Sequence, residues 1–120
     1  GHVTPTLEEQ VAQADYIVLE SNHDEDMLRM GKYPAHLKGR ISGPRGPLSN
    51  RASARLLAQH ATPRLKHVWL CHLSEENNHP ELARKTMETV CHSFGLQPGI
   101  DFGMDILRRK TPSEMYELEP

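Results

Sequence analysis

Two clusters of polar side chains in this sequence contain the residue types that bind metal ions or transfer protons. Glu20, His23 and Asp24 form the first cluster, and His72 and His79 belong to the second. Imidazole and carboxylate groups together bind zinc or manganese, and imidazole also transfers protons near neutral pH. The spacing does not match a closed zinc motif. The other interpretation is therefore that some of the eight histidines lie near acids by chance.

Each cluster follows a short apolar run that predicts a buried strand. The two runs cover residues 16–19 and 67–71, and a third strand, at the edge of the sheet, is predicted over residues 102–107. The carboxyl ends of neighbouring parallel strands meet at one edge of a sheet. We therefore expect the two clusters to converge if the first two strands are parallel neighbours.

Helix signals separate these strands. Thr6 and Glu9 form a capping box for a helix through about residue 13, and Pro80 starts a helix that Gly95 ends. Three more helices are predicted: one whose first turn contains the acidic residues 24–26, one over 35–40, and one from a cap at 49 or 50 to about 60. This alternation of helices and strands predicts an α/β fold with one continuous core.

Length and composition fit one small globular domain. The chain has 120 residues, a formal net charge of −2 and 37% hydrophobic residues. No apolar run approaches the roughly 20 residues that span a bilayer, and the first residues lack a signal pattern, so we expect a cytoplasmic protein. Cys71 and Cys91 lie far apart without a CxxC spacing, which predicts buried free thiols.

The charges are distributed unevenly along the chain. No Asp or Glu occurs between Met27 and Ser74, a segment that we call the basic window. It contains nine basic residues: Arg29, Lys32, Lys38, Arg40, Arg45, Arg51, Arg55, Arg64 and Lys66. Such a window predicts one positive face that binds a phosphate-rich ligand, and the alternative is an ordinary solvated surface.

A set of sequence blocks occurs in one order along the chain. The blocks are Gly1-His2-Val3-Thr4, residues 14–24 (ADYIVLESNHD), Tyr33-Pro34 followed by Leu37-Lys38 and Arg40-Ile41, Leu48-Ser49-Asn50, and His72-Leu73-Ser74 followed by Asn77-Asn78. Together they resemble the metallo-β-lactamase-fold hydrolases of the YycJ type. The likeness runs from Gly1 to about Leu107, and several blocks in the right order are more specific than any single motif.

The resemblance implies a cytoplasmic, metal-dependent hydrolase with a dinuclear zinc or manganese site, of a kind whose relatives act as 5′-to-3′ DNA exonucleases. It implies a four-layer αβ/βα sandwich made of two similar halves, of which residues 1–120 resemble only the second, C-terminal half. We therefore expect a single domain that is half of such a sandwich. Because the resemblance places most metal ligands in the first half, we expect this chain alone to be inactive and to bind no metal tightly.

The resemblance also assigns roles to individual residues. His72 matches the last metal-ligand histidine, and Glu20 matches a carboxylate that orients a proton-donating histidine in related nucleases. That histidine normally stands in a Gly-His-Leu-Ser-Asn block, which here has Pro47 in its second position. Proline cannot transfer a proton, so His23 or His36 would have to replace the missing histidine.

The candidate site follows from these assignments. In metal-assisted phosphodiester cleavage the metals generate hydroxide and neutralise phosphoryl charge, while a histidine protonates the leaving oxygen. The candidates for catalysis are Glu20, His23 and Asp24, and His72 is the candidate metal ligand. Nucleic acid would contact Lys38, Arg40, Arg45, Ser49 and Asn50, and the residues expected beside the site are His2, Asn77 and Asn78.

A second hypothesis is a non-catalytic module that associates through an uncovered sheet face. Continuous apolar strands are typical of sheets covered on both faces, and helices within this chain can cover only one. A second copy of the chain, or a separate N-terminal half, would cover the other face. We expect Ile17, Leu19, Val68 and Leu70 to lie in or beneath this interface.

Overall fold

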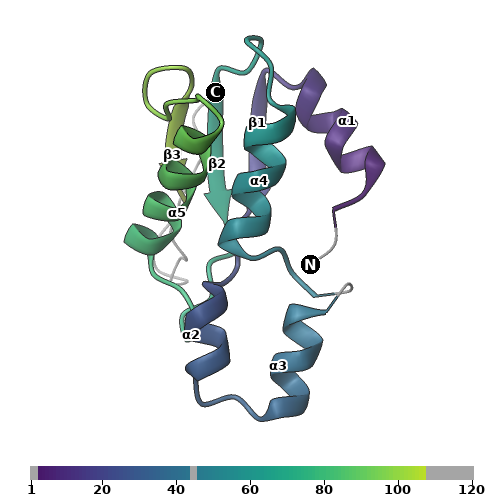
Figure 1. Ribbon diagram of the computed structural model, residues 1–120, viewed down its shortest axis with the longest axis vertical. Helices are drawn as coiled ribbons and strands as arrows, with labels where there is room; N and C mark the ends of the chain where they lie inside the picture. The colour runs from purple at the N-terminus through teal and green to yellow at the C-terminus, as the bar shows by residue number, and fades with distance from the viewer. Residues whose placement is uncertain (1–2, 44–45, 108–120) are drawn as a thin grey trace, which may run out of the picture.

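The computed structural model describes residues 3–43 and 46–107, and its centre is a three-stranded parallel sheet (Figure 1). The strands are β1 (Tyr16–Glu20), β2 (His67–Cys71) and β3 (Gly103–Ile106), in the order β1-β2-β3. This confirms the predicted α/β fold and all three strands. The register pairs Leu19 with Leu70 and Glu20 with Cys71. Both clusters of polar side chains therefore lie at the same edge of the sheet.

The helices form two groups. Helices α1 (Pro5–Gln13), α4 (Asn50–His60) and α5 (Pro80–Ser93) pack on one face of the sheet, with α4 in contact with both others. Helices α2 (Glu25–Met30) and α3 (Ala35–Ser42) form a separate pair beyond the carboxyl ends of the strands (Figure 1). Among the described residues, no helix is both long and apolar enough to cross a membrane.

Short polar side chains determine where the helices begin. Asp24 caps α2 and so lies just before the first turn in which it was expected, and Ser49, one of the two predicted caps, caps α4. The capping box proposed at Thr6 is wrong, because α1 begins two residues earlier, with Thr4 as its cap and Pro5 as its first residue. Proline favours the first helical position, where its missing N–H is not needed. That preference places the cap immediately before Pro5.

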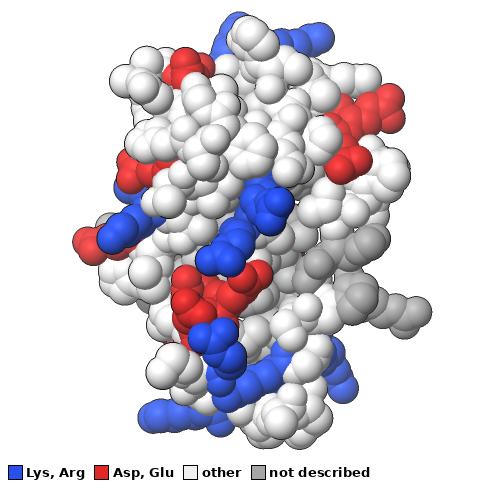
Figure 2. Space-filling model, viewed as in Figure 1, with Lys and Arg blue, Asp and Glu red and all other residues white. Residues whose placement is uncertain are grey.

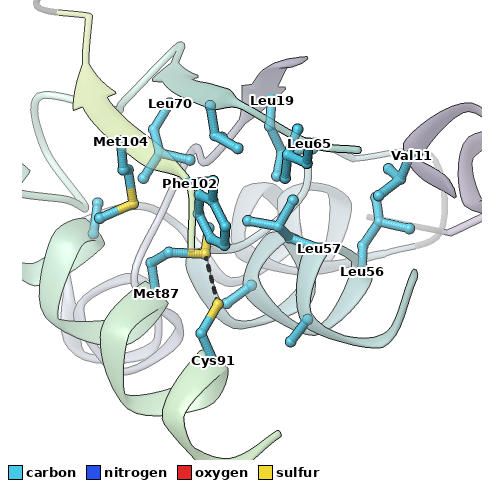
Figure 3. Packing of buried hydrophobic residues seen from close by; sticks show 14 of the residues in the cluster. Val11, Leu19, Leu56, Leu57, Leu65, Leu70, Met87, Cys91, Phe102 and Met104 are labelled. Carbon is cyan, nitrogen blue, oxygen red and sulfur yellow. Dashed lines mark hydrogen bonds between the residues drawn. The ribbon is translucent and has the colours of Figure 1, made fainter. Parts of the chain in front are cut away.

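The hydrophobic core lies between the sheet and helices α1, α4 and α5 (Figure 3). Leu19, Val68 and Leu70 point into it and are buried, together with Leu57 of α4 and Met87 of α5. Side chains along a strand alternate between the two faces of a sheet. Tyr16, Val18, His67 and Trp69, which alternate with the core residues along β1 and β2, therefore lie on the opposite face, which we call the open face.

The open face carries aromatic side chains that none of the described helices covers. Tyr16 is 61% exposed and Val18 is 56% exposed. The Trp69 ring lies 6.2 Å from the Tyr16 ring and 4.4 Å from the His67 ring, measured between centroids. Four residues were expected in or beneath an interface: Ile17, Leu19, Val68 and Leu70. Their side chains point toward the helices, so they lie beneath the open face.

A glycine shapes one end of the open face. The His67 imidazole lies across Gly103 of the neighbouring strand, where a Cβ atom would overlap the ring. In this position His67 Nε2 lies 2.8 Å from Asp105 Oδ2. The absence of a side chain at Gly103 therefore allows a His67–Asp105 pair to lie flat on the sheet.

The two cysteines are free, as predicted. Cys91 is buried, its Sγ lies 3.7 Å from Met87 Sδ (Figure 3), and burial raises the pKa of its thiol to about 11. Cys71 is half-buried at the end of β2, and desolvation raises its pKa as well. Both thiols are therefore protonated at neutral pH, which disfavours a nucleophilic role.

Candidate functional site

A cleft of about 690 Å³ opens at the carboxyl edge of the sheet. Its lining includes Asn22 after β1, His72 and Asn77 after β2, and Tyr33 and Pro47 from the long connection between these strands. Ligands bind preferentially at this edge of open parallel sheets. The cleft is therefore the best candidate for a functional site in the described part of the chain.

Glu20 and His72 meet at this edge, as the sequence predicted. The distance from His72 Nδ1 to Glu20 Oε2 is 3.6 Å, and the side chains are 74% and 35% exposed, respectively. The other carboxylate oxygen, Glu20 Oε1, accepts a hydrogen bond of 2.9 Å from the backbone N–H of Leu48. Glu20 is thus anchored to the residue after Pro47, while the imidazole of His72 remains accessible.

His23 lies in a different environment. Its side chain is buried, and desolvation lowers the pKa of its imidazole despite the carboxylates of Glu25, Asp24 and Glu20 nearby. It lines a second hollow of about 380 Å³, between α2, α3 and the start of α4. The linings of the cleft and of this hollow have no residue in common. His23 and His72 therefore open into separate spaces, and the structure does not bring them together.

Asp24 and His79 each cap a helix. Asp24 Oδ2 accepts a 3.0 Å hydrogen bond from the N–H of Met27, and His79 Nδ1 accepts one of 3.1 Å from the N–H of Glu81. Each bond occupies one of the two side-chain atoms through which that residue could bind a metal ion. Both residues therefore have a sufficient structural role as helix caps.

The described residues contain no group of three or more His, Cys, Asp or Glu side chains that could hold a metal ion. His72 lines the cleft and Glu20 lies beside His72, whereas a catalytic zinc normally has three protein ligands. The donor set of residues 3–43 and 46–107 is therefore too small for a complete metal site.

This small donor set gives a direct expectation. Isothermal titration calorimetry of the purified chain with zinc should show no stoichiometric site with submicromolar affinity, because one exposed imidazole and one carboxylate bind zinc weakly. The control is the His72→Ala variant, which should give the same weak signal. A submicromolar site that His72→Ala abolishes would contradict this expectation.

Buried polar side chains connect the loops at this edge. Ser21 Oγ donates to Asn50 Oδ1 at 2.5 Å, and Asn50 Nδ2 donates to Asn78 Oδ1 at 2.8 Å. Asn78 Nδ2 lies 2.9 Å from the Ser21 carbonyl and 3.1 Å from the Asn22 carbonyl, both of which accept from it. We call Ser21, Asn50 and Asn78 the buried polar network. The sequence placed Asn78 beside the site but did not predict this network.

The other candidate residues are spread around the edge. Ser49 Oγ donates to Glu25 at 3.0 Å, and Lys38 Nζ donates to the carbonyl of Arg29 at 2.7 Å. Asn77 is buried beside the cleft, and Arg40 is exposed on α3. His2 and Arg45 lie outside the described residues.

The basic window pairs partly with acids from elsewhere in the chain. Three of its arginines form ion pairs with carboxylates outside the window: Arg29 with Asp26, Arg51 with Glu25 and Arg64 with Asp15. Figure 2 shows basic side chains gathered over α2 and α3, with acidic side chains directly beside them. The separation of charge along the sequence therefore produces a limited basic surface over these two helices, next to the candidate site.

Comparison with known proteins gives close relatives but no matching family model and no significantly similar solved structure. The chain is 36% identical over 115 residues to the exodeoxyribonuclease YycJ of Bacillus anthracis, and 39% identical over 118 residues to the exodeoxyribonuclease WalJ of two Streptococcus pneumoniae strains. These matches cover 96% and 98% of the chain, but only 44% of each relative. The chain is therefore homologous, along nearly its whole length, to the YycJ and WalJ proteins.

Proposed function

We propose that this chain is the C-terminal half of a metal-dependent exodeoxyribonuclease with a metallo-β-lactamase fold, and that it forms one wall of the active site. The observation that carries the proposal is the Glu20–His72 pair beside a cleft at the carboxyl edge of a parallel sheet. The names of the relatives support DNA as the substrate class. The three-stranded sheet with helices on one face is consistent with half of a sandwich.

In this proposal the reaction is hydrolysis of a phosphodiester bond, in which bound zinc or manganese would activate water and neutralise phosphoryl charge. His72 would be one protein ligand, and Glu20 would hold the nearby loop through the Leu48 N–H. Pro47 lines the same cleft and has no proton to donate. The proton donor must therefore be another group, and His23, one candidate for that role, opens into the separate hollow and not into this cleft. We also infer a cytoplasmic location, which the two unpaired thiols support.

The proposal can be tested in a chimera in which this chain replaces the matching segment of a WalJ protein. Digestion of 5′-phosphorylated linear DNA by the chimera should decrease roughly 100-fold or more with His72→Ala, because a catalytic metal would lose a ligand. The matched control is His92→Ala, which removes an exposed imidazole at the end of α5. Full activity of a correctly folded His72→Ala chimera would refute the proposed role.

The basic surface gives a separate expectation about DNA binding. The chain should bind DNA weakly and without sequence preference, and its affinity should decrease steeply as salt increases, because contacts to phosphates release counterions. Joint substitution of Lys38, Arg40 and Arg45 by glutamine should reduce both the affinity and the salt dependence in fluorescence anisotropy. A control with Arg84 and Lys85, which lie on the exposed side of α5, replaced by glutamine should retain both. Unchanged binding by the triple variant would show that the basic window is an ordinary solvated surface and does not bind DNA.

The open face of the sheet favours a second candidate function, which is association. Tyr16 and Val18 are more than half exposed, and the Trp69 ring lies near the rings of both Tyr16 and His67. Exposed apolar patches of this kind mark interaction surfaces. We propose that a further protein layer covers the open face, supplied by the N-terminal half of the sandwich or, in its absence, by a second copy of the chain.

A further inference from the structure

His72 has an unusual backbone conformation. Its φ of 58° is positive, and no other residue with a Cβ has a positive φ among residues 3–43 and 46–107. The left-handed region is unfavourable for such residues because the Cβ atom crowds the backbone carbonyl. Conformations of this kind persist only where surrounding contacts enforce them, and they concentrate at functional sites.

One side chain supplies a contact of this kind. Asn22 Nδ2 donates a 2.9 Å hydrogen bond to the carbonyl oxygen of His72. The backbone of Asn22 is bonded to the same loop, because its carbonyl accepts a 2.7 Å hydrogen bond from the N–H of Ser74. Asn22 therefore contacts the chain at the left-handed residue and again two residues later.

Asn22 is itself fixed in place. Its N–H donates to the Leu48 carbonyl at 2.9 Å, and its own carbonyl also accepts from Asn78 Nδ2. The Asn22 Oδ1 atom lies 3.3 Å from His23 Nδ1. If His23 Nδ1 carries a proton, this contact directs Oδ1 toward His23 and leaves Nδ2 facing His72.

We propose that Asn22 is a positioning residue that holds the backbone of His72 in the left-handed conformation and so directs its imidazole from the end of β2 into the cleft beside Glu20. The catalytic meaning of this role rests on the proposed function of His72. The conformational role rests only on the contacts of Asn22.

The first test is NMR of the chain with Asn22→Ala. The unmodified chain should show for His72 the strong intraresidue amide–Hα cross-peak and the carbon chemical shifts of a left-handed residue, and Asn22→Ala should abolish them. Asn22→Asp is the conservative variant, because it keeps the acceptor toward His23 and lacks the donor toward His72. It should give the same result even if Asn22→Ala does not fold. Thr4→Ala, which removes a helix cap elsewhere, is the control and should leave the His72 signals unchanged.

The second test is a double-mutant cycle with His72→Gly. Glycine adopts positive φ at no steric cost, so a glycine at position 72 no longer needs to be held. Asn22→Ala should raise the unfolding equilibrium constant roughly fivefold in the unmodified background, the effect of one hydrogen bond, and clearly less in the His72→Gly background. Equal effects in both backgrounds, or left-handed His72 signals that persist in both Asn22 variants, would overturn the proposal.

The chimera separates this inference from the proposed nuclease function. If both hold, Asn22→Ala should lower kcat much more than it changes KM, because the substrate-binding surface over α2 and α3 is untouched. If the NMR signature is lost but even His72→Ala leaves DNA digestion unchanged, the proposed function fails while the positioning role of Asn22 stands.

Discussion

Replacement of Asn78 by alanine is expected to lower the free energy of unfolding by about 3 kcal/mol, measured by urea denaturation. The change removes a hydrogen-bond partner from the buried Asn50 side chain and from the buried Ser21 carbonyl, whereas the Asn22 carbonyl keeps its bond from the Ser74 N–H. A buried polar group that loses its partner costs about 1–3 kcal/mol, and more than one is affected here. The loss should also appear as a lower thermal midpoint.

Two further variants sharpen this expectation. Gln59→Ala, at an exposed position of α4, should change the stability by less than about 0.5 kcal/mol. Asn50→Ala combined with Asn78→Ala should cost less than the sum of the single changes, because both remove the same hydrogen bonds. Additive effects, or a loss below about 1 kcal/mol for Asn78→Ala, would show that water replaces the buried polar network without penalty.

Light scattering of the chain alone is expected to show a dimer or a larger assembly at micromolar concentration. The open face would be the contact surface, because Tyr16, Val18 and Trp69 form an apolar patch on it. Tyr16→Ser together with Val18→Lys should raise the dissociation constant roughly 100-fold, since both would be central to the contact and a buried lysine would be unpaired.

The control for this experiment is a residue that is equally apolar but lies elsewhere. Ile100 is 78% exposed and outside the sheet, so Ile100→Lys should leave the assembly intact. Ile17 and Leu19 point into the helix-covered core, and their substitution should cause unfolding rather than clean dissociation. A cooperatively folded monomer of the unmodified chain at micromolar concentration would refute the association.

The sequence predicted the elements of the fold better than it predicted which faces the strands bury. The strands at 16–20 and 67–71 were evident because each is apolar and ends in a polar turn. The sequence did not reveal which strand side chains point toward the helices, because Tyr16, Val18 and Trp69 on the open face are apolar like the core residues between them. Alternation of apolar and polar residues along a strand shows which face is buried only where the opposite face is polar. The three-dimensional packing of the helices was needed to distinguish the two.

The candidate site was predictable only in part for a similar reason. The meeting of Glu20 and His72 followed from the parallel strands, since both residues lie at strand ends. The separation of His23 from His72 depends on the direction of one side chain in a turn, which spacing does not determine. The ion pair between Arg64 and Asp15 joins residues far apart in the chain, so a count of charges within the basic window could not reveal it.

The central position of β2 has a consequence for how the molecule opens. β2 is hydrogen-bonded to both neighbours, whereas β1 and β3 each have one partner strand among the described residues. When a fluctuation releases one edge strand, the amides that link β2 to the remaining strand stay hydrogen-bonded and protected from exchange. Backbone amides of Val68 to Leu70 should therefore exchange with deuterated water last, at the rate of global unfolding, while some amides of β3 exchange sooner through partial opening of the chain after residue 93.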